Sequence, residues 1–163
     1  MDLAEVYVAL GRNRCNRLVR TIAIGALKTY GVYEGIKIRS RLRRFNRQKL
    51  RAAAPRLWQR VTEGDNELAR ELAQAVLVSN IPLVVGVLDL LEIEHDGIGF
   101  FAKDDDYTEQ LSDGWEARVY ERFSGQFPDD LVLLYINHLG WETGTLDEPF
   151  TGADGNGLSE RSA

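Results

Sequence analysis

The chain has 163 residues, of which 44% are hydrophobic and 28% charged, and this ordinary globular composition excludes wholesale disorder. Its single cysteine, Cys15, excludes an intramolecular disulfide and is consistent with a reducing compartment, so we expect a cytoplasmic protein. The first five residues lack the basic charge of a signal peptide, and Asn80, Pro82 and Asp89 interrupt the longest apolar stretch, Val76 to Ile93. We therefore predict neither export nor a membrane span.

Charge is divided unevenly along the chain. Residues 1–60 contain 15 Lys and Arg and 3 Asp and Glu, a net charge of +12, whereas residues 61–163 have a net charge of −17. Such a division indicates a surface that meets an anion, a membrane surface or another protein. If the basic residues pack against the acidic half of the same chain instead, the asymmetry says nothing about partners. The residues that we expect to carry the interaction are Lys37, Arg39, Arg41, Arg43, Arg44, Arg47, Lys49 and Arg51.

The first third of the chain predicts helices. Apolar residues recur at helical spacing from Leu3 to Leu10, and a second helix is expected from about Asn13 to Tyr30. Ile36, Ile38 and Leu42 alternate as in a strand, but the many arginines and the alanines 52–54 favour a third helix in this segment. We expect Pro55 to break that helix and to start a short one that ends near residue 64.

The middle of the chain predicts two more helices and a turn. Asp65 or Asn66 can cap a helix that reaches Ser79, and Pro82 fits the first turn of an apolar helix that ends at Leu91. Between residues 93 and 101 an Asp-Gly pair lies among alternating apolar residues, which indicates a short β-hairpin or a tight loop.

The last third predicts two helices and a tail. Asp113 and Glu116 have the spacing of a capping box before a helix, and Asp129 can cap an apolar helix to about Trp141. After Gly144 no periodicity remains, so residues 144–163 are predicted to form a mobile tail. The expected fold is all-α, an irregular bundle of about seven helices. We expect one domain over residues 1–143, with lobes 1–64 and 65–143 as the alternative.

No catalytic motif is recognisable, and the candidates for a metal site are few. His95 and Asp96 could belong to a metal-dependent phosphohydrolase, but the chain has no earlier histidine to complete that pattern. His138 and Glu142 are spaced i, i+4 and could reach one ion from one helix face, although two ligands are too few for zinc. We therefore predict no metal and no cofactor. Cys15 is expected to be a small buried helix residue.

Three hypotheses about function follow from these features. The first is a non-enzymatic helical protein that associates with itself or with a protein partner through its basic residues 1–60 and its acidic residues 61–163. The alternative is a nucleic-acid-binding protein that uses the basic segment 35–62. The third is a metal-dependent hydrolase. No small-molecule substrate is evident.

Overall fold

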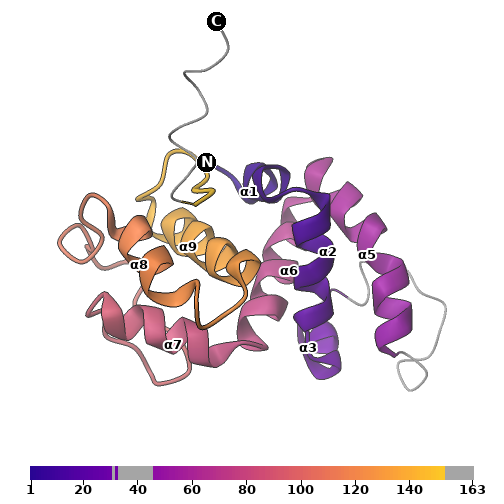
Figure 1. Ribbon diagram of the computed structural model, residues 1–163, viewed down its shortest axis with the longest axis horizontal. Helices are drawn as coiled ribbons and strands as arrows, with labels where there is room; N and C mark the ends of the chain where they lie inside the picture. The colour runs from indigo at the N-terminus through magenta and orange to yellow at the C-terminus, as the bar shows by residue number, and fades with distance from the viewer. Residues whose placement is uncertain (31, 33–45, 153–163) are drawn as a thin grey trace, which may run out of the picture. The chain divides into compact units, whose positions relative to one another are not determined.

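The computed structural model describes residues 1–30, 32 and 46–152, and these residues form helices and loops without a strand. The prediction of an all-α fold is therefore confirmed, and no β-hairpin forms between residues 93 and 101. Figure 1 shows the helices in chain order. The described helices are α1 (Leu3–Leu10), α2 (Arg12–Thr21), α3 (Ile24–Thr29), α5 (Arg47–Thr62), α6 (Asn66–Val78), α7 (Ile81–Leu90), α8 (Trp115–Phe123) and α9 (Asp129–Thr143).

The chain divides into two compact units. The first is Asp2–Ile81, with the described helices α1, α2, α3, α5 and α6, and the second begins at Pro82 and contains most of α7 together with α8 and α9. This division follows Ile81, whereas the alternative with two lobes has its boundary at residue 64. Residue 64 connects α5 to α6 inside the first unit. No single helix of the described chain has the length and apolar character to cross a membrane; α6 and α7 reach that standard only together.

The first unit is built around contacts of α2 with α5 and of α1 with α2, α5 and α6 (Figure 1). Tyr7 of α1 is buried, and its hydroxyl donates a hydrogen bond to the carbonyl of Ala69 on α6 at 3.0 Å. Burial raises the pKa of Tyr7 well above its ordinary value, so the phenol stays neutral. Cys15 lies buried on α2. The hydroxyl that Tyr7 brings into the core of this unit therefore has a hydrogen-bond partner.

The predicted helix from Asn13 to Tyr30 is wrong, because the structure has two helices there, α2 and α3. Ile22 is extended (φ −68°, ψ 128°) and fully buried, and the N–H of Ala23 donates at 2.9 Å to the Oγ of Ser79, the residue that caps the C-terminal end of α6. A side chain 56 residues away in sequence thus supplies the hydrogen bond that a continuous helix would have supplied.

The predicted break at Pro55 is also wrong. Helix α5 runs through Pro55 and buries one continuous face, made of Leu50, Ala53, Ala54, Leu57 and Val61. An interior proline costs about 3 kcal/mol, and burying the large side chains on this face offsets that cost at about 1.5–3 kcal/mol each. The part of the predicted third helix that precedes residue 46 lies outside the described residues.

Side chains cap α1, α5 and α6 of the first unit, whereas neither α8 nor α9 has a side-chain cap. Asp2 and Glu5 form a capping box at α1, and Asp65 Oδ1 accepts the N–H of Leu68 at the start of α6. The capping box predicted from Asp113 is wrong, since the cap of α8 is Gly114 in the left-handed region (φ 81°) and no side chain bonds there. Asp129 is the first residue of α9, after Pro128, and does not cap it.

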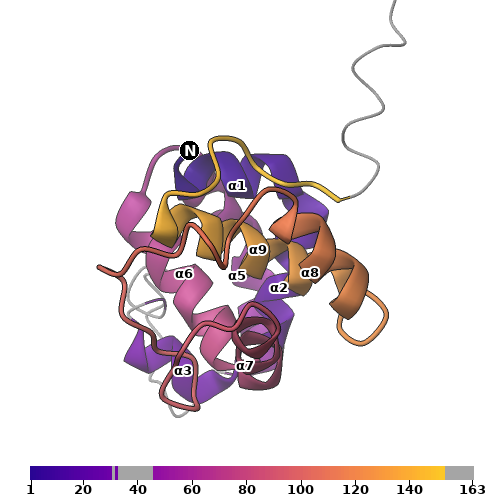
Figure 2. The same cartoon turned by 90° about the vertical axis from the view of Figure 1, so that its left-hand side faces the viewer.

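Helix α9 is the most buried of the described helices, because every residue from Asp130 to Gly140 is buried. The segment after it, Thr145 to Gly152, has no regular structure, yet it runs back over α9 in both views (Figures 1 and 2). Phe150 packs edge-on against Tyr120 of α8, with ring centroids 5.9 Å apart. Residues 145–152 of the predicted mobile tail are therefore bound to the helices of their unit. Residues 153–163 lie outside the described part.

Candidate functional sites

Two features of the described surface could bind a partner: a group of arginines on the first unit and a pocket on the second. The predicted interaction residues fall partly on the first of these. Arg47, Lys49 and Arg51 lie in the first two turns of α5, where Arg47 and Arg51 are exposed and Lys49 is half-buried. The remaining five lie outside the described residues: Lys37, Arg39, Arg41, Arg43 and Arg44.

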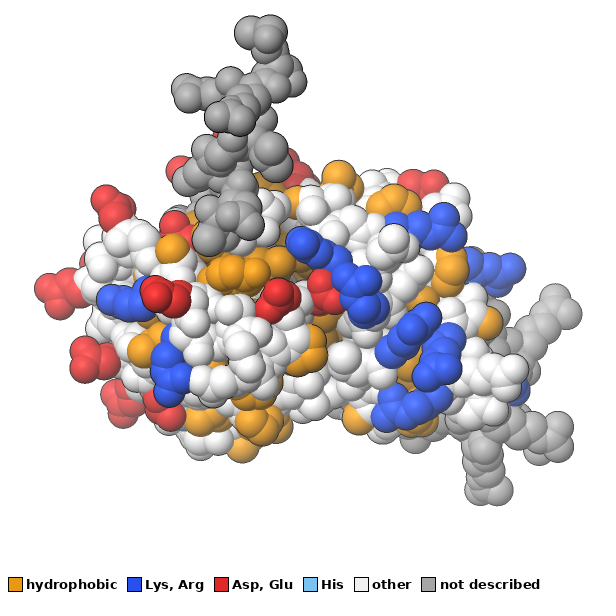
Figure 3. Space-filling model, in the orientation of Figure 1, with side chains coloured by type: hydrophobic (Ala, Val, Ile, Leu, Met, Phe, Trp, Pro, Cys, Tyr) orange, Lys and Arg blue, Asp and Glu red, His pale blue; other side chains and the backbone are white. Residues whose placement is uncertain are grey.

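Helix α2 contributes arginines that sequence reasoning missed. Arg17 and Arg20 are exposed and spaced i, i+3, on the side of α2 opposite the buried Cys15, Leu18 and Val19. That spacing places them on one face, and it is a signal that the sequence already contains. Figure 3 shows Lys and Arg side chains gathered over the first unit.

The two pairs of arginines are joined by a hydrogen bond. Arg47 Nη1 donates to the backbone carbonyl of Arg20 at 2.9 Å, so a cation of α5 meets the negative end of α2. Arg51 follows Arg47 by one turn, and α2 and α5 pack directly against each other. We call Arg17, Arg20, Arg47 and Arg51 the basic surface. Within the described part of the first unit, Arg20, Arg47 and Arg51 form no ion pair with a carboxylate.

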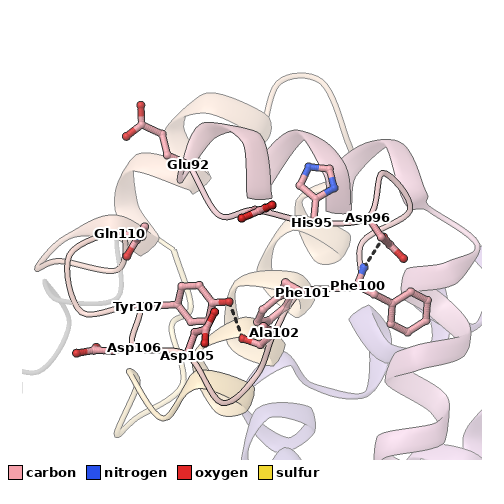
Figure 4. A pocket seen from close by; sticks show the side chains of 11 residues that line it. Glu92, His95, Asp96, Phe100, Phe101, Ala102, Asp105, Asp106, Tyr107 and Gln110 are labelled. Atoms are coloured by element: carbon pink, nitrogen blue, oxygen red, sulfur yellow. Dashed lines mark hydrogen bonds between the residues drawn. The ribbon is translucent and has the colours of Figure 1, made fainter.

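The second feature is a pocket of about 770 Å³ formed by the loops that follow α7, and we call it the acidic pocket (Figure 4). Its lining residues are Glu92, Glu94, His95, Asp96, Phe100, Phe101, Ala102, Asp105, Asp106, Tyr107 and Gln110. Figure 4 shows Glu92, His95 and Asp96 on one side of it and Asp105, Asp106 and Tyr107 on the other. No lysine or arginine lines it, so its field is negative.

One wall of the acidic pocket is shaped by Asp96. Its Oδ1 accepts the N–H groups of Ile98 and Phe100, both at 3.0 Å, and its own N–H donates to the carbonyl of Phe100 at 3.0 Å. These N–H donors, that of Ile98 first, hold the pKa of Asp96 below its ordinary value. Gly99 (φ +106°) lies so close to α7 that a Cβ there would be 2.5 Å from Val84 Cγ1. The loop is therefore fixed, and Ile98 and Phe100 remain exposed at 55% and 62%.

The opposite wall is held by Asp106 and Tyr107. Asp106 accepts hydrogen bonds from the hydroxyl and the N–H of Thr108, which lower its pKa. The Tyr107 hydroxyl donates to the carbonyl of Ala102 at 2.5 Å, and its ring lies edge-on to Phe101 with centroids 5.6 Å apart. Burial, then the charge of Asp105 and of Glu94, raises the pKa of Tyr107. Both walls are thus ordered by local hydrogen bonds.

The metal-site candidates His95 and Asp96 both have local structural roles in this pocket. His95 Nδ1 accepts the N–H of Gly97 at 3.0 Å, which leaves the proton on Nε2, 2.9 Å from Asp89 Oδ1. Both ring nitrogens are therefore engaged, and the Asp96 carboxylate holds its loop.

His138 and Glu142 lie together on α9, as their spacing predicts. His138 Nδ1 is 3.5 Å from Glu142 Oε2, and Lys103 Nζ is 2.6 Å from Glu142 Oε1. Burial lowers the pKa of His138, and Lys103 lowers it further against the raising effect of Glu142. Among the described residues, no group of three or more His, Cys, Asp or Glu is arranged to hold a metal ion.

Comparison with known proteins does not extend this picture. No protein-family model, no curated protein and no solved structure matches the chain.

Proposed function

We propose that the protein is a non-enzymatic interaction protein that associates with itself or with an acidic protein partner through the basic surface. The observation that carries this proposal is the placement of Arg17, Arg20, Arg47 and Arg51 on two packed helices of one unit. Guanidinium groups present a planar set of donors that matches carboxylates. Exposed charges of this kind steer encounter and fix the orientation of a complex more than they supply its affinity.

The acidic residues of the second unit provide the complementary charge. Asp104, Asp105 and Asp106 are exposed in succession, and Asp96 and Glu94 are exposed on the neighbouring loop. A chain that carries both signs on separate units can pair with another copy of itself, basic surface to acidic surface.

The experiment is sedimentation of the purified chain at low and high salt, with charge-reversal variants. Arg20→Glu with Arg51→Glu should abolish association, whereas Arg56→Glu with Arg70→Glu makes the same charge change at exposed sites outside the basic surface and should preserve it. Association in the wild type should weaken with salt because exposed charges are screened. If the first double variant associates as the wild type does, the proposal is wrong.

A second candidate is nucleic-acid binding, since the same arginines can pair with phosphate. It predicts binding of labelled duplex DNA at low salt, with log K falling against log salt at a slope of about −0.9 per phosphate neutralised. Loss of that binding in the variant Arg20→Glu with Arg51→Glu would favour this candidate over a protein partner. The metal-dependent hydrolase stays a prediction without an assembled ligand set in the described chain.

A further inference from the structure

The segment from Thr145 to Gly152 lies on the helices of its own unit in the manner of a bound peptide. It has no regular structure, and its polar contact comes from Asn137 of α9, which is 1% exposed. The side-chain amide of Asn137 donates to the carbonyl of Phe150 and accepts the N–H of Phe150. Both bonds reach backbone atoms, so any residue except proline could form them at position 150.

Two side chains of the segment have contacts of their own. Leu146 lies against Gly140 of α9, where a Cβ would come within 2.5 Å of Leu146 Cγ. The ring of Phe150 packs edge-on against Tyr120 of α8. We call Tyr120, Asn137 and Gly140 the segment site. It recognises a backbone through one buried amide and two apolar side chains through α8 and α9.

The segment site requires an occupant. If the segment leaves, Oδ1 of Asn137 loses the N–H of Phe150 while it remains in a buried position. A buried polar atom without a partner costs about 1–3 kcal/mol. An opened copy is therefore stabilised by any segment that brings a free N–H and C=O to Asn137, whether that segment belongs to the same copy or to another one.

The link between α9 and the segment permits such an exchange. Gly144 ends α9 in the left-handed region (φ 66°), and a Cβ there would meet nothing within 4 Å. Asp147 and Glu148, between the two apolar contacts, are exposed, whereas Leu146 and Phe150 are half-buried. A segment that is held by few buried contacts opens at low cost in free energy.

We propose that the segment site accepts residues 145–152 of a second copy in place of the chain's own segment. This inference goes beyond the proposed function and does not depend on the basic surface. The second copy is the occupant because every copy carries the segment whose fit to the site the structure shows, and an exchange forms the same bonds again.

The chain's own segment competes with that of the second copy. A segment on a short link has an effective concentration of roughly millimolar. Exchange between intact copies is therefore a minor population in dilute solution, and it becomes the main contact when one copy lacks the segment and the other lacks the site.

The test is a complementation experiment with two full-length variants. The acceptor, Leu146→Ala with Phe150→Pro, keeps the site but lacks the N–H and the side chains that fill it. The donor, Asn137→Ala, keeps the segment but lacks the amide that holds it. Both also carry Arg20→Glu with Arg51→Glu, so that association through the basic surface does not contribute and a failure here leaves the proposed function untouched.

The readouts are sedimentation and the side-chain amide resonances of Asn137 in a ¹⁵N-labelled acceptor. Each variant alone should be monomeric, and an equimolar mixture should form a 1:1 complex. The Asn137 resonances, displaced in the acceptor alone, should return to their wild-type positions when the unlabelled donor is added. The matched control replaces the exposed Asp147 and Glu148 by alanine in the same background; it should keep the wild-type resonances by itself and form no complex with the donor.

A mixture without a complex, or a complex in which the Asn137 resonances stay displaced, would overturn the exchange. A second measurement does not need the donor to fold. The capped peptide of residues 145–152 should bind the acceptor, the same peptide with Phe150→Pro should not, and the wild type should bind the first peptide at least about tenfold more weakly because its own segment occupies the site.

The peptide also separates the possible occupants. Binding of the peptide to the acceptor without binding of a folded donor would assign the segment site to another extended peptide and overturn the second-copy proposal. Equal binding of the peptide to the wild type and the acceptor, or binding to neither, would overturn the segment site itself.

Discussion

Asn137 of α9 and Phe150 are joined by a reciprocal pair of hydrogen bonds. Asn137 Nδ2 donates to the carbonyl of Phe150 at 2.8 Å, and the N–H of Phe150 donates to Asn137 Oδ1 at 2.7 Å. Nδ2 of Asn137 also donates to the carbonyl of Leu133 at 2.8 Å. Both the amide nitrogen and the amide oxygen of this buried side chain therefore have hydrogen-bond partners. This pair explains why the segment after α9 is bound although its sequence shows no periodicity.

Replacing Asn137 by alanine should release that segment. The backbone groups of Phe150 lose their partners, and leaving buried polar groups unpaired costs about 1–3 kcal/mol. Urea denaturation should show a loss of stability of this size, and limited proteolysis should cut between residues 145 and 152. Asn13→Ala, at an exposed position of α2, should change neither measurement. Unaltered proteolysis in Asn137→Ala would mean that other contacts hold the segment.

Gly140 permits the close approach of the same segment. A Cβ at this position would lie 2.5 Å from Leu146 Cγ and even closer to its Cδ1. Gly140→Ala should therefore lower the free energy of unfolding by about 1–3 kcal/mol, as overpacking does, despite the better helix propensity of alanine. Gly25→Ala in α3, where nothing lies within 4 Å, should instead be neutral or stabilising. A Gly140→Ala protein as stable as the wild type would show that Leu146 moves aside at no cost.

Helix ends set by neighbouring residues can be predicted from the sequence. Asp65 caps α6 and Pro82 lies in the first turn of α7, as expected, because both effects act within one turn of the chain. The break at Ile22 could not be predicted, since the N–H of Ala23 bonds to Ser79, the C-cap of α6, which is 56 residues away in sequence. Pro55 is the opposite case: local chemistry predicts a break, and packing of the buried face of α5 prevents it.

In the candidate sites, too, local features can be predicted from the sequence, whereas contacts between distant residues cannot. Charge along the chain predicts a basic surface, but not that Arg20 and Arg47 meet, because that contact exists only once α2 and α5 pack. The acidic pocket could not be predicted, since its residues lie in loops whose sequence has no periodic pattern. The sequence makes His95 and Asp96 candidate metal ligands. In the structure they accept hydrogen bonds from the N–H groups of Gly97 and Phe100 and so stabilise the wall of the pocket.

Removing Pro55 should stabilise the protein. Pro55→Ala supplies an N–H where the helix lacks one and removes the clash of the ring with the preceding turn, a gain of up to about 3 kcal/mol. The gain is reduced by the greater freedom of the unfolded chain, a cost of about 0.4–1 kcal/mol. Thermal and urea denaturation measure the sum. Pro82→Ala is the matched control and should not stabilise, because a proline in the first turn of α7 displaces no helical hydrogen bond. Equal effects of the two substitutions would contradict this account of α5.

His138 should make the stability of the protein depend on pH. This residue is 3% exposed, and neither ring nitrogen has a hydrogen-bond partner in the described structure. Burial holds its pKa below the ordinary value, so as the pH falls through about 6.5 the unfolded chain takes up the proton first and the folded state loses stability. Free energies of unfolding should therefore decrease from about pH 7 to about pH 5, above the range where carboxylates titrate. In His138→Leu this decrease should largely vanish, whereas His95→Gln should retain it. An equal decrease in His138→Leu and the wild type would assign the effect to another group.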